Sequence, residues 1–236
     1  MRATAETLRG IDLFADLSAD ERRELANRCQ VHHFEADKRV VAREDSSTDV
    51  YFIVSGKVRV TIFSRSGKEV SFRDLAAGQL FGDVSAIDGG RRSASVVTLS
   101  DAIIVSMPAE VFWEVLHRHP AAAAVMLREL TRLIRSLSER VVEFSTLGVK
   151  NRIHAELLRL AREHMRDGNT AVITPAPTHN EIASRVSTHR EAVTRELNHL
   201  VQDGLIERQR GSLTILDVAR LSRIVEDVQG SAKSRS

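Results

Sequence analysis

The stretch 81–96, FGDVSAIDGGRRSASV, contains the residues best suited to binding a small anionic ligand. Gly82 lets the backbone come close to a ligand, and the first turn of the short helix expected after it leaves amide donors for an anion. Arg92 can add a charge-assisted, forked contact to the same phosphate. Asp83 would repel a bare phosphate, so its carboxylate indicates a ligand that also offers a sugar hydroxyl. The chemistry expected of this stretch is therefore the binding of a sugar phosphate.

The same stretch resembles the phosphate-binding cassette of cyclic-nucleotide-binding domains, with the pattern F-G-E, about nine residues, and then R-[ST]-A. The resemblance implies that Gly82 contacts the ribose phosphate through its backbone and that Arg92 pairs with the cyclic phosphate. It implies that Asp83 accepts the ribose 2′-hydroxyl, although Asp is one methylene shorter than the family's Glu, which weakens or shifts that contact. Ser93 would add a hydroxyl and a backbone amide. The cassette residues expected to contact the ligand are Gly82, Asp83, Val84, Ser85, Arg92, Ser93 and Ala94.

Short stretches rich in β-branched residues lie on both sides of the cassette. They occupy residues 39–42, 49–54, 57–63, 69–75, 95–99 and 102–106, and turn residues separate them. Spacings of about ten residues with period-two alternation predict an antiparallel roll or barrel. The alternative interpretation of the cassette, a glycine-rich turn with a surface arginine pair, does not need such a roll. Residues 1–118 are therefore expected to form a cyclic-nucleotide-binding β-roll domain that ends in a helix opened by Pro108.

A long helix is expected after Pro120, within a segment 119–148 that ends at a Gly148 hinge. Apolar residues recur along this helix in alternating steps of four and three: Ala123, Leu127, Leu130, Ile134, Leu137, Val141 and Phe144. A heptad seam as narrow as this predicts a two-stranded coiled coil rather than docking on the chain's own domain. We therefore expect a homodimer that pairs through residues 120–145.

The C-terminal residues 149–225 carry the pattern of a winged helix-turn-helix. Thr178 with Glu181 forms a capping box that opens one helix, and a break at 187–188 leads to a second helix over 190–202. Two short helices joined by a tight turn can place the second one in a major groove of DNA. A hairpin over 205–216 with a basic tip at 210–212 supplies the wing. Residues 226–236 end in a small, polar, unperiodic run, which predicts a disordered tail.

The second of these helices begins with side chains that can read base edges. Arg190, Glu191 and Arg195 lie on one face, where each arginine can fork onto a guanine and the glutamate can accept from a cytosine amine. This R-E-x-x-x-R resembles the recognition helix of cyclic AMP receptors of the Crp-Fnr family, which implies a palindromic double-stranded DNA operator with TGTGA-like half-sites. The alternative is that Glu191 caps its own helix with Thr188 and that the arginines touch only phosphate or solvent. The DNA contacts expected are His179, Thr188, His189, Arg190, Glu191 and Arg195.

The choice of nucleotide is expected to depend on two residues of the long helix. By the same resemblance, Leu137 and Ser138 occupy the positions of a Thr-Ser pair that reaches the adenine. Leucine cannot hydrogen-bond the exocyclic amine of the purine, and losing such a contact costs about 1 kcal/mol or more. Ser138 keeps a hydroxyl that can reach a purine. We expect cyclic AMP as the allosteric ligand, with cyclic GMP as the second candidate and another effector, or none, as the further alternative.

The composition narrows the classes of protein to which this chain can belong. Its 236 residues, 42% apolar and 28% charged, have the balance of a globular protein with room for two small domains. No apolar run is long enough to span a membrane. The single cysteine, Cys29, excludes an internal disulfide and favours the reducing cytoplasm. His32 and His33 would point to opposite faces of a strand, so no metal site is expected.

Together these observations predict an α+β fold: an N-terminal cyclic-nucleotide-binding β-roll, a long dimerisation helix and a C-terminal winged helix-turn-helix. The part from residue 146 onward holds 14 Lys and Arg against 11 Asp and Glu, a mildly basic balance that suits a polyanion. No catalytic constellation or P-loop is recognisable, so an enzyme is not expected. The expected function is a homodimeric, cyclic-nucleotide-responsive transcription regulator with RNA polymerase as a further partner. A nucleotide-gated regulatory subunit of an enzyme or channel is the alternative from another class.

Overall fold

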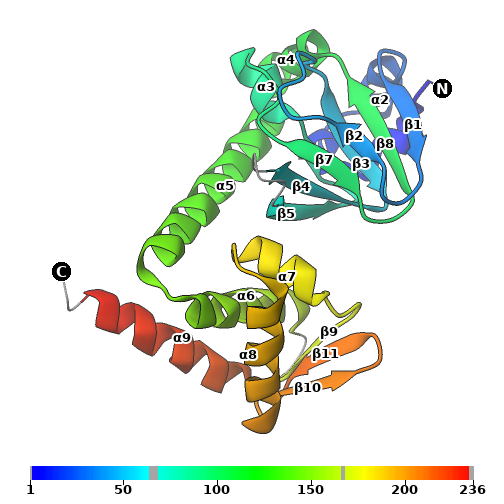
Figure 1. Ribbon diagram of the computed structural model, residues 1–236. Helices are drawn as coiled ribbons and strands as arrows, with labels where there is room; N and C mark the ends of the chain where they lie inside the picture. Colours follow the sequence, from blue (N-terminus) through cyan, green and yellow to red (C-terminus); the bar gives the residue numbers. More distant parts are fainter. Residues whose placement is uncertain (1, 64–68, 166–167, 234–236) are drawn as a thin grey trace. The chain divides into compact units, whose positions relative to one another are not determined.

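The computed structural model describes residues 2–63, 69–165 and 168–233 (Figure 1). The chain divides into two compact units, Met1–Leu133 and Ile134–Ser236, and the described residues of each unit have a hydrophobic core of their own. Among these described residues, no helix combines the length and the apolar character that crossing a membrane requires.

The first unit is an antiparallel β-roll flanked by helices. Two four-stranded sheets have the orders β1-β8-β3-β6 and β2-β7-β4-β5. Their strands are β1 (Gln30–Phe34), β2 (Arg39–Val41), β3 (Val50–Ser55), β4 (Lys57–Phe63), β5 (Glu69–Ala76), β6 (Leu80–Phe81), β7 (Ser95–Thr98) and β8 (Ala102–Met107). The helices of this unit are α1 (Ala5–Leu8), the 3₁₀ turn η1 (Asp12–Phe14), α2 (Ala19–Ala26), α3 (Asp83–Asp88) and α4 (Ala109–Arg118). The roll predicted from the alternating pattern is confirmed.

Alternation along the strands decides which side chains fill the roll. One core cluster includes Ile53, Val58, Leu75 and Ile104, each at most 3% exposed. A register shift between Val60 and Thr61 puts one extra residue into β5, a β-bulge. On β5, residues 73 and 75 lie on the same side of the bulge and pair with Val60 and Val58, so they share one face. An arginine at position 73 therefore lies on the same face as the buried Leu75.

The long helix α5 (Pro120–Thr146) begins in the first unit and ends in the second (Figure 1). Its first half packs on the roll, where Ala122 and Met126 are buried and Leu130 is partly buried against the same core cluster. Leu130 was expected in the dimer seam; part of its side chain packs against the chain's own core, and its place in the seam stays a prediction. Other seam positions expose large apolar side chains, namely Leu127 (65%), Ile134 (63%), Leu137 (38%), Val141 (64%) and Phe144 (39%).

The second unit contains the predicted helix-turn-helix and wing. Its elements are α6 (Val149–His164), β9 (Ala171–Ile173), α7 (His179–Arg185), α8 (Arg190–Gln202), β10 (Ile206–Gln209), β11 (Ser212–Ile215) and α9 (Val218–Lys233), and its sheet order is β10-β11-β9. The disordered tail expected from residue 226 is a correction, since α9 continues to Lys233. An apolar stripe at steps of three and four packs in the core and stabilises this helix; it consists of Val218, Leu221 and Val225. Residues 234–236 lie outside the described part.

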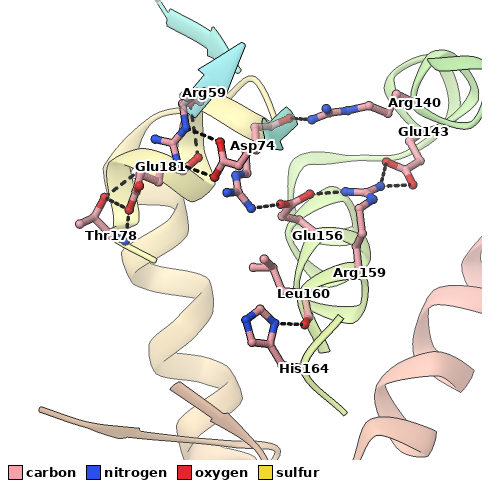
Figure 2. Close-up of polar contacts among 12 residues, drawn as sticks. Arg59, Asp74, Arg140, Glu143, Glu156, Arg159, Leu160, His164, Thr178 and Glu181 are labelled. Carbon is pink, nitrogen blue, oxygen red and sulfur yellow. Dashed lines mark hydrogen bonds and ion pairs between the residues drawn. The ribbon is translucent and has the colours of Figure 1, made fainter. Parts of the chain in front are cut away.

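An ionic network connects the last turns of α5 to α6 and α7 (Figure 2). Arg159 of α6 donates to both carboxylate oxygens of Glu143 of α5, at 3.0 and 3.2 Å. Glu156, 3% exposed, accepts from Arg159 and, at 3.0 Å, from Arg185 of α7. Arg140 of α5 donates to the carbonyl oxygen of Arg185 at 2.6 Å. Three helices are thereby cross-linked by charged side chains where α5 meets the helix-turn-helix.

Candidate ligand and DNA sites

The cassette is shaped by a glycine at the start of α3. Gly82 has a φ of 82°, in the left-handed region that favours glycine. A Cβ atom at this position would lie 2.7 Å from Nη1 of Arg92 and 2.8 Å from the carbonyl oxygen of Asp49, closer than real Cβ atoms come. Residue 82 is therefore glycine both for its backbone angle and because the arginine packs directly against it.

The guanidinium of Arg92 is buried beneath this turn. It donates from Nη1 to the carbonyl oxygen of Gly82 (3.0 Å), from Nη2 to that of Asp49 (2.8 Å) and from Nε to the Ser47 hydroxyl (3.1 Å). It also lies 5.5 Å from the ring centre of Tyr51, a cation–π contact. Only 2% of Arg92 is exposed, and these oxygen acceptors are uncharged. The arrangement holds a buried positive charge that uncharged acceptors do not neutralise.

Asp83, one residue after the glycine, is 4% exposed. Burial raises the pKa of its carboxyl group, and Arg73 gives the largest opposing effect. Hydrogen bonds from the backbone amides of Asp83 and Val84, and then the charge of Arg92, lower the pKa further. The site therefore holds a carboxylate and two guanidinium groups within one small region of the roll.

A small cavity lies beside Asp83, between β5, β6 and the first half of α5. Its volume is about 60 Å³, and the residues that line it include Asp12, Arg73, Gln79, Leu80, Asp83, Met126 and Glu129. Pockets that hold drug-sized ligands usually measure about 300–1,000 Å³. A cyclic nucleotide would therefore fit only after side chains of the wall have moved.

The structure brings together four of the predicted cassette residues. Gly82, Asp83, Ser85 and Arg92 are neighbours, and the Ser85 hydroxyl lies 3.4 Å from Nη1 of Arg92. Val84 and Ala94 are half-buried and Ser93 is exposed.

Leu137 and Ser138, the predicted purine contacts, belong to the second unit. Ser138 donates its hydroxyl to the carbonyl oxygen of Ile134 at 2.9 Å. A role for these two residues in roofing the ligand stays a prediction.

Sequence reasoning missed Arg73, Tyr51 and Glu129. The signal for Arg73 was present, because it is a charged residue two positions before the apolar Leu75 in a stretch expected to be a strand. Tyr51 and Glu129 reach the region from β3 and α5, which are far apart in the sequence, and no local pattern marks them.

In the second unit, the turn between α7 and α8 has the shape that the sequence predicted. Thr178 caps α7 with a reciprocal Thr178–Glu181 capping box. Ser187 adopts a φ of 54°, the left-handed conformation for which glycine is favoured. The backbone amide of Thr188 then donates to the carbonyl oxygen of Ala183 at 2.9 Å and closes the turn.

The predicted base-reading residues occupy the start of α8. His189 is the N-cap residue, and Arg190, Glu191 and Arg195 are exposed. Within the described residues α8 has no side-chain cap, so the alternative in which Glu191 and Thr188 cap the helix is not observed. The three charged side chains remain accessible to a partner.

His179, predicted to contact a DNA phosphate, links the two helices. Its Nδ1 lies 2.6 Å from the Thr194 hydroxyl, and that hydroxyl donates to the carbonyl oxygen of Arg190 at 3.0 Å. Nδ1 must then carry the proton and donate to Thr194. Burial, followed by the charges of Arg208 and Arg190, lowers the pKa of His179. The side chain is therefore a neutral hydrogen-bonding group at neutral pH and holds α7 against α8.

The wing is a short hairpin with an exposed basic tip. Gly211 takes a φ of 84° in the turn between β10 and β11, next to the exposed Arg210. Arg208 of β10 donates to the Asn198 side-chain oxygen at 3.2 Å, which connects the hairpin to α8. This hairpin matches the wing expected from the sequence. Within the described residues, no cluster of three or more His, Cys, Asp or Glu side chains could hold a metal ion.

Comparison with known proteins gives two family matches in one chain. The model of the cyclic nucleotide-binding domain matches residues 31–119, and that of the Crp-like helix-turn-helix domain matches residues 151–224. The cyclic AMP receptor protein of Thermus thermophilus is 28% identical over 92% of this chain and 98% of its own length. A CRP-like cAMP-activated global transcriptional regulator of Mycobacterium tuberculosis is 28% identical over 84% of this chain and 89% of its length.

Solved structures show the same fold at lower identity. A mutant of CooA from Carboxydothermus hydrogenoformans superposes with a TM-score of 0.75 at 19% identity, over 84% of this chain and 88% of that one. The c-di-GMP responsive global regulator CLP of Xanthomonas campestris has a TM-score of 0.68 at 18% identity, over 80% of this chain and 94% of that one. Because the two domains occur in the same order as in relatives matched over most of their length, the chain belongs to the Crp-Fnr family of DNA-binding transcription regulators.

Proposed function

We propose that this protein is a homodimeric regulator that answers to a cyclic nucleotide, cyclic AMP first and cyclic GMP second, and reads a TGTGA-like palindrome in the cytoplasm. The observation that carries the proposal is the buried pair of opposite charges beside Gly82. A cyclic nucleotide offers the complement of that pair, a phosphate for Arg92 and a ribose hydroxyl for Asp83. Two of the relatives are named for cyclic AMP, which supports the first choice of ligand.

The proposed mechanism is a shift between two populations. Nucleotide bound in the roll would favour one arrangement of the paired α5 helices, and with it one spacing of the two α8 helices. That spacing must match half-sites about one DNA turn apart, roughly 34–36 Å. A ligand acts in this way only if it binds one arrangement more tightly than the other.

The exposed apolar face of α5 supports the dimer. Leu127, Ile134 and Val141 are each at least 63% exposed, and they lie at the heptad spacing of a two-stranded coiled coil. Apolar side chains exposed in a row along one helix favour a partner that covers them. A second copy of α5 presents the same row and is the partner that we propose.

A different effector is the second candidate, and particular features favour it. The cavity beside Asp83 is small, Asp replaces the family's Glu, and Leu137 lacks a hydrogen-bonding group. CLP of Xanthomonas campestris, a protein of the same fold, is named as responsive to c-di-GMP, a different nucleotide.

The ligand is tested by isothermal titration of the full-length protein with cyclic AMP and, separately, cyclic GMP. We expect one or both to bind, and Arg92→Leu to abolish binding. Arg91→Leu is the matched control, since Arg91 is exposed and donates to the carbonyl oxygen of Glu44 rather than into the cassette. Because Arg92 also holds the turn together, thermal melting of each variant must show that it is folded.

The link between the ligand and DNA is tested by gel shift on a TGTGA palindrome with and without nucleotide. The proposal predicts that the nucleotide that binds also strengthens retardation of this DNA. If neither nucleotide binds, or if binding leaves the DNA affinity unchanged, another effector replaces the cyclic nucleotide. A protein that never retards DNA would contradict the regulator itself.

A further inference from the structure

Arg73 is a charged side chain in an unusual place, the inward face of a strand of the roll. Its neighbour on that face, Leu75, is 3% exposed. Arg73 itself is half-buried and lines the same small cavity as Asp83. Placing a guanidinium on such a face costs free energy unless an opposite charge accompanies it. The carboxylate of Asp83 is the buried opposite charge in that cavity.

We propose that Arg73 is a positioning residue of the ligand site, which keeps Asp83 in the charged form that can accept a hydroxyl of the ligand. The proposal rests on the proposed function, in which Asp83 accepts the ribose hydroxyl. Asp83 is 4% exposed, and a carboxyl group buried this deeply prefers its neutral form unless a cation stands beside it. A neutral carboxyl group has lost much of its capacity to accept a hydrogen bond.

The charges around Asp83 leave Arg73 as the residue best placed for this task. Arg92 lies near the C-terminal end of the cassette. Its guanidinium donates hydrogen bonds to oxygens of Gly82, Asp49 and Ser47 rather than to Asp83. Asp12 of η1 and Glu129 of α5 line the cavity as well, and both are negative and favour a protonated Asp83. Consistent with this arrangement, Arg73 makes the largest contribution that lowers the pKa of Asp83, ahead of Arg92.

The pairing of Arg73 with Asp83 also accounts for the aspartate that this cassette has in place of the family's longer glutamate. An aspartate keeps its carboxylate closer to the backbone of α3 than a glutamate would, and at this position the residue is 4% exposed. Arg73 of β5, which lines the same cavity, offsets the effect of this burial. On this interpretation Asp83 and Arg73 act as a unit, and their substitutions will not have additive effects.

The first test measures the ionisation of Asp83 in the unliganded protein. Carboxyl carbons of ¹³C-labelled aspartate are followed by NMR from about pH 8 to about pH 3, with Asp83→Asn to assign the signal. Arg73→Met keeps the length and removes the charge, Arg73→Gln is the second neutral variant, and Arg73→Lys restores the charge. Arg39→Met is the matched control, an exposed arginine on β2 of the same sheet.

We expect the titration midpoint of Asp83 to rise in the two neutral variants and to stay near the wild-type value in Arg73→Lys and Arg39→Met. An unchanged midpoint in Arg73→Met and Arg73→Gln would overturn the proposal. This measurement needs no ligand, so it decides the role of Arg73 even if the wild-type protein binds neither nucleotide.

The second test follows cyclic AMP and cyclic GMP affinity against pH by calorimetry. Ionised Asp83 accepts the hydroxyl more strongly than the neutral carboxyl group does. In the neutral Arg73 variants Asp83 becomes protonated at a higher pH, so their affinity starts to fall at a higher pH than that of wild type. Loss of a hydrogen bond to a charged group corresponds to about 10- to 100-fold in affinity. In an Asp83→Asn background, Arg73→Met should have little further effect. A loss that is equal at every pH would instead show that Arg73 binds the phosphate directly.

Discussion

At the scale of single residues, the cassette depends on a glycine whose backbone angle is left-handed and whose surroundings leave no space for a side chain. Gly82 places Arg92 against the backbone, and Arg92 in turn connects Gly82, Asp49 and Ser47. Gly89, at the other end of α3, also has a positive φ, of 70°, but a Cβ atom there would meet nothing within 4 Å. Substitutions at these two glycines can therefore separate the cost of backbone strain from the cost of steric contact.

Gly82→Ala is expected to lower the free energy of unfolding of the first unit by about 2–4 kcal/mol, because left-handed strain and overpacking against Arg92 add together. Gly89→Ala, the matched control, carries the strain alone and should cost about 1 kcal/mol. Urea denaturation followed by circular dichroism measures both values. Equal losses in the two variants would show that the contact with Arg92 contributes nothing.

Arg190→Ala is expected to weaken binding to a TGTGA palindrome by about 1–3 kcal/mol and to relax selectivity at one base pair, because a forked contact to a guanine is lost. Fluorescence anisotropy with the palindrome and with singly substituted palindromes measures both effects. Arg162→Ala, an exposed arginine on α6, is the control. An equal loss on random DNA would show that Arg190 touches phosphate only.

At the scale of elements, the helix-turn-helix is held to the end of α5 by charged side chains rather than by apolar packing alone. Glu156 is the centre of this network, since it accepts from Arg159 of α6 (Figure 2) and also from Arg185 of α7. Replacing all the partners of a buried ion pair by apolar residues changes the free energy of unfolding little. Removing only one partner costs more, because the remaining charges stay buried without compensation.

Glu156→Gln is therefore expected to lower the free energy of unfolding of the second unit by about 3 kcal/mol. Glu163→Gln, at an exposed position on the same helix, should change it by less than about 0.5 kcal/mol. Differential scanning calorimetry of both variants checks the difference. A Glu156→Gln protein as stable as the wild type would mean that Arg159 and Arg185 find adequate partners without it.

At the scale of the whole molecule, the proposed dimer has to present two recognition helices to one operator. The exposed row on α5 offers a test, because Ile134 is 63% exposed within the heptad seam and Val142, 58% exposed, lies outside it. Both are β-branched residues on the same helix, which makes them a matched pair.

Ile134→Glu is expected to convert the proposed dimer to a monomer, because a charge in a coiled-coil seam is buried without a partner. Affinity for the palindrome should fall by about 100-fold or more, since two linked contacts become one. Light scattering and gel shift measure the two effects, with Val142→Glu as the control. A monomeric wild-type protein, or a dimeric Ile134→Glu variant, would contradict pairing through this seam.

Local rules were enough to predict much of the fold and part of the site. The alternating stretches around residues 49–63 are strands, the Thr178–Glu181 capping box starts α7, and α8 begins at Arg190 as expected. These features depend on neighbours within a few residues, namely cap hydrogen bonds, strand alternation and the glycine angles of turns. The cassette belongs to the same class, because Gly82, Asp83 and Arg92 come from one short stretch of chain.

Only the tertiary structure decided the features that depend on long-range burial. Leu130 fits a heptad seam and is also partly buried against the core of its own unit, and α9 runs past residue 225, with its apolar stripe in the core around α6. Arg73 lines the same cavity as Asp83 because the fold of the roll brings β5 and the start of α3 together. The sequence by itself determined which short segments could bind an anion and read DNA. Which charges accompany Asp83, and which apolar residues are left for a partner, followed from packing between segments far apart in the chain.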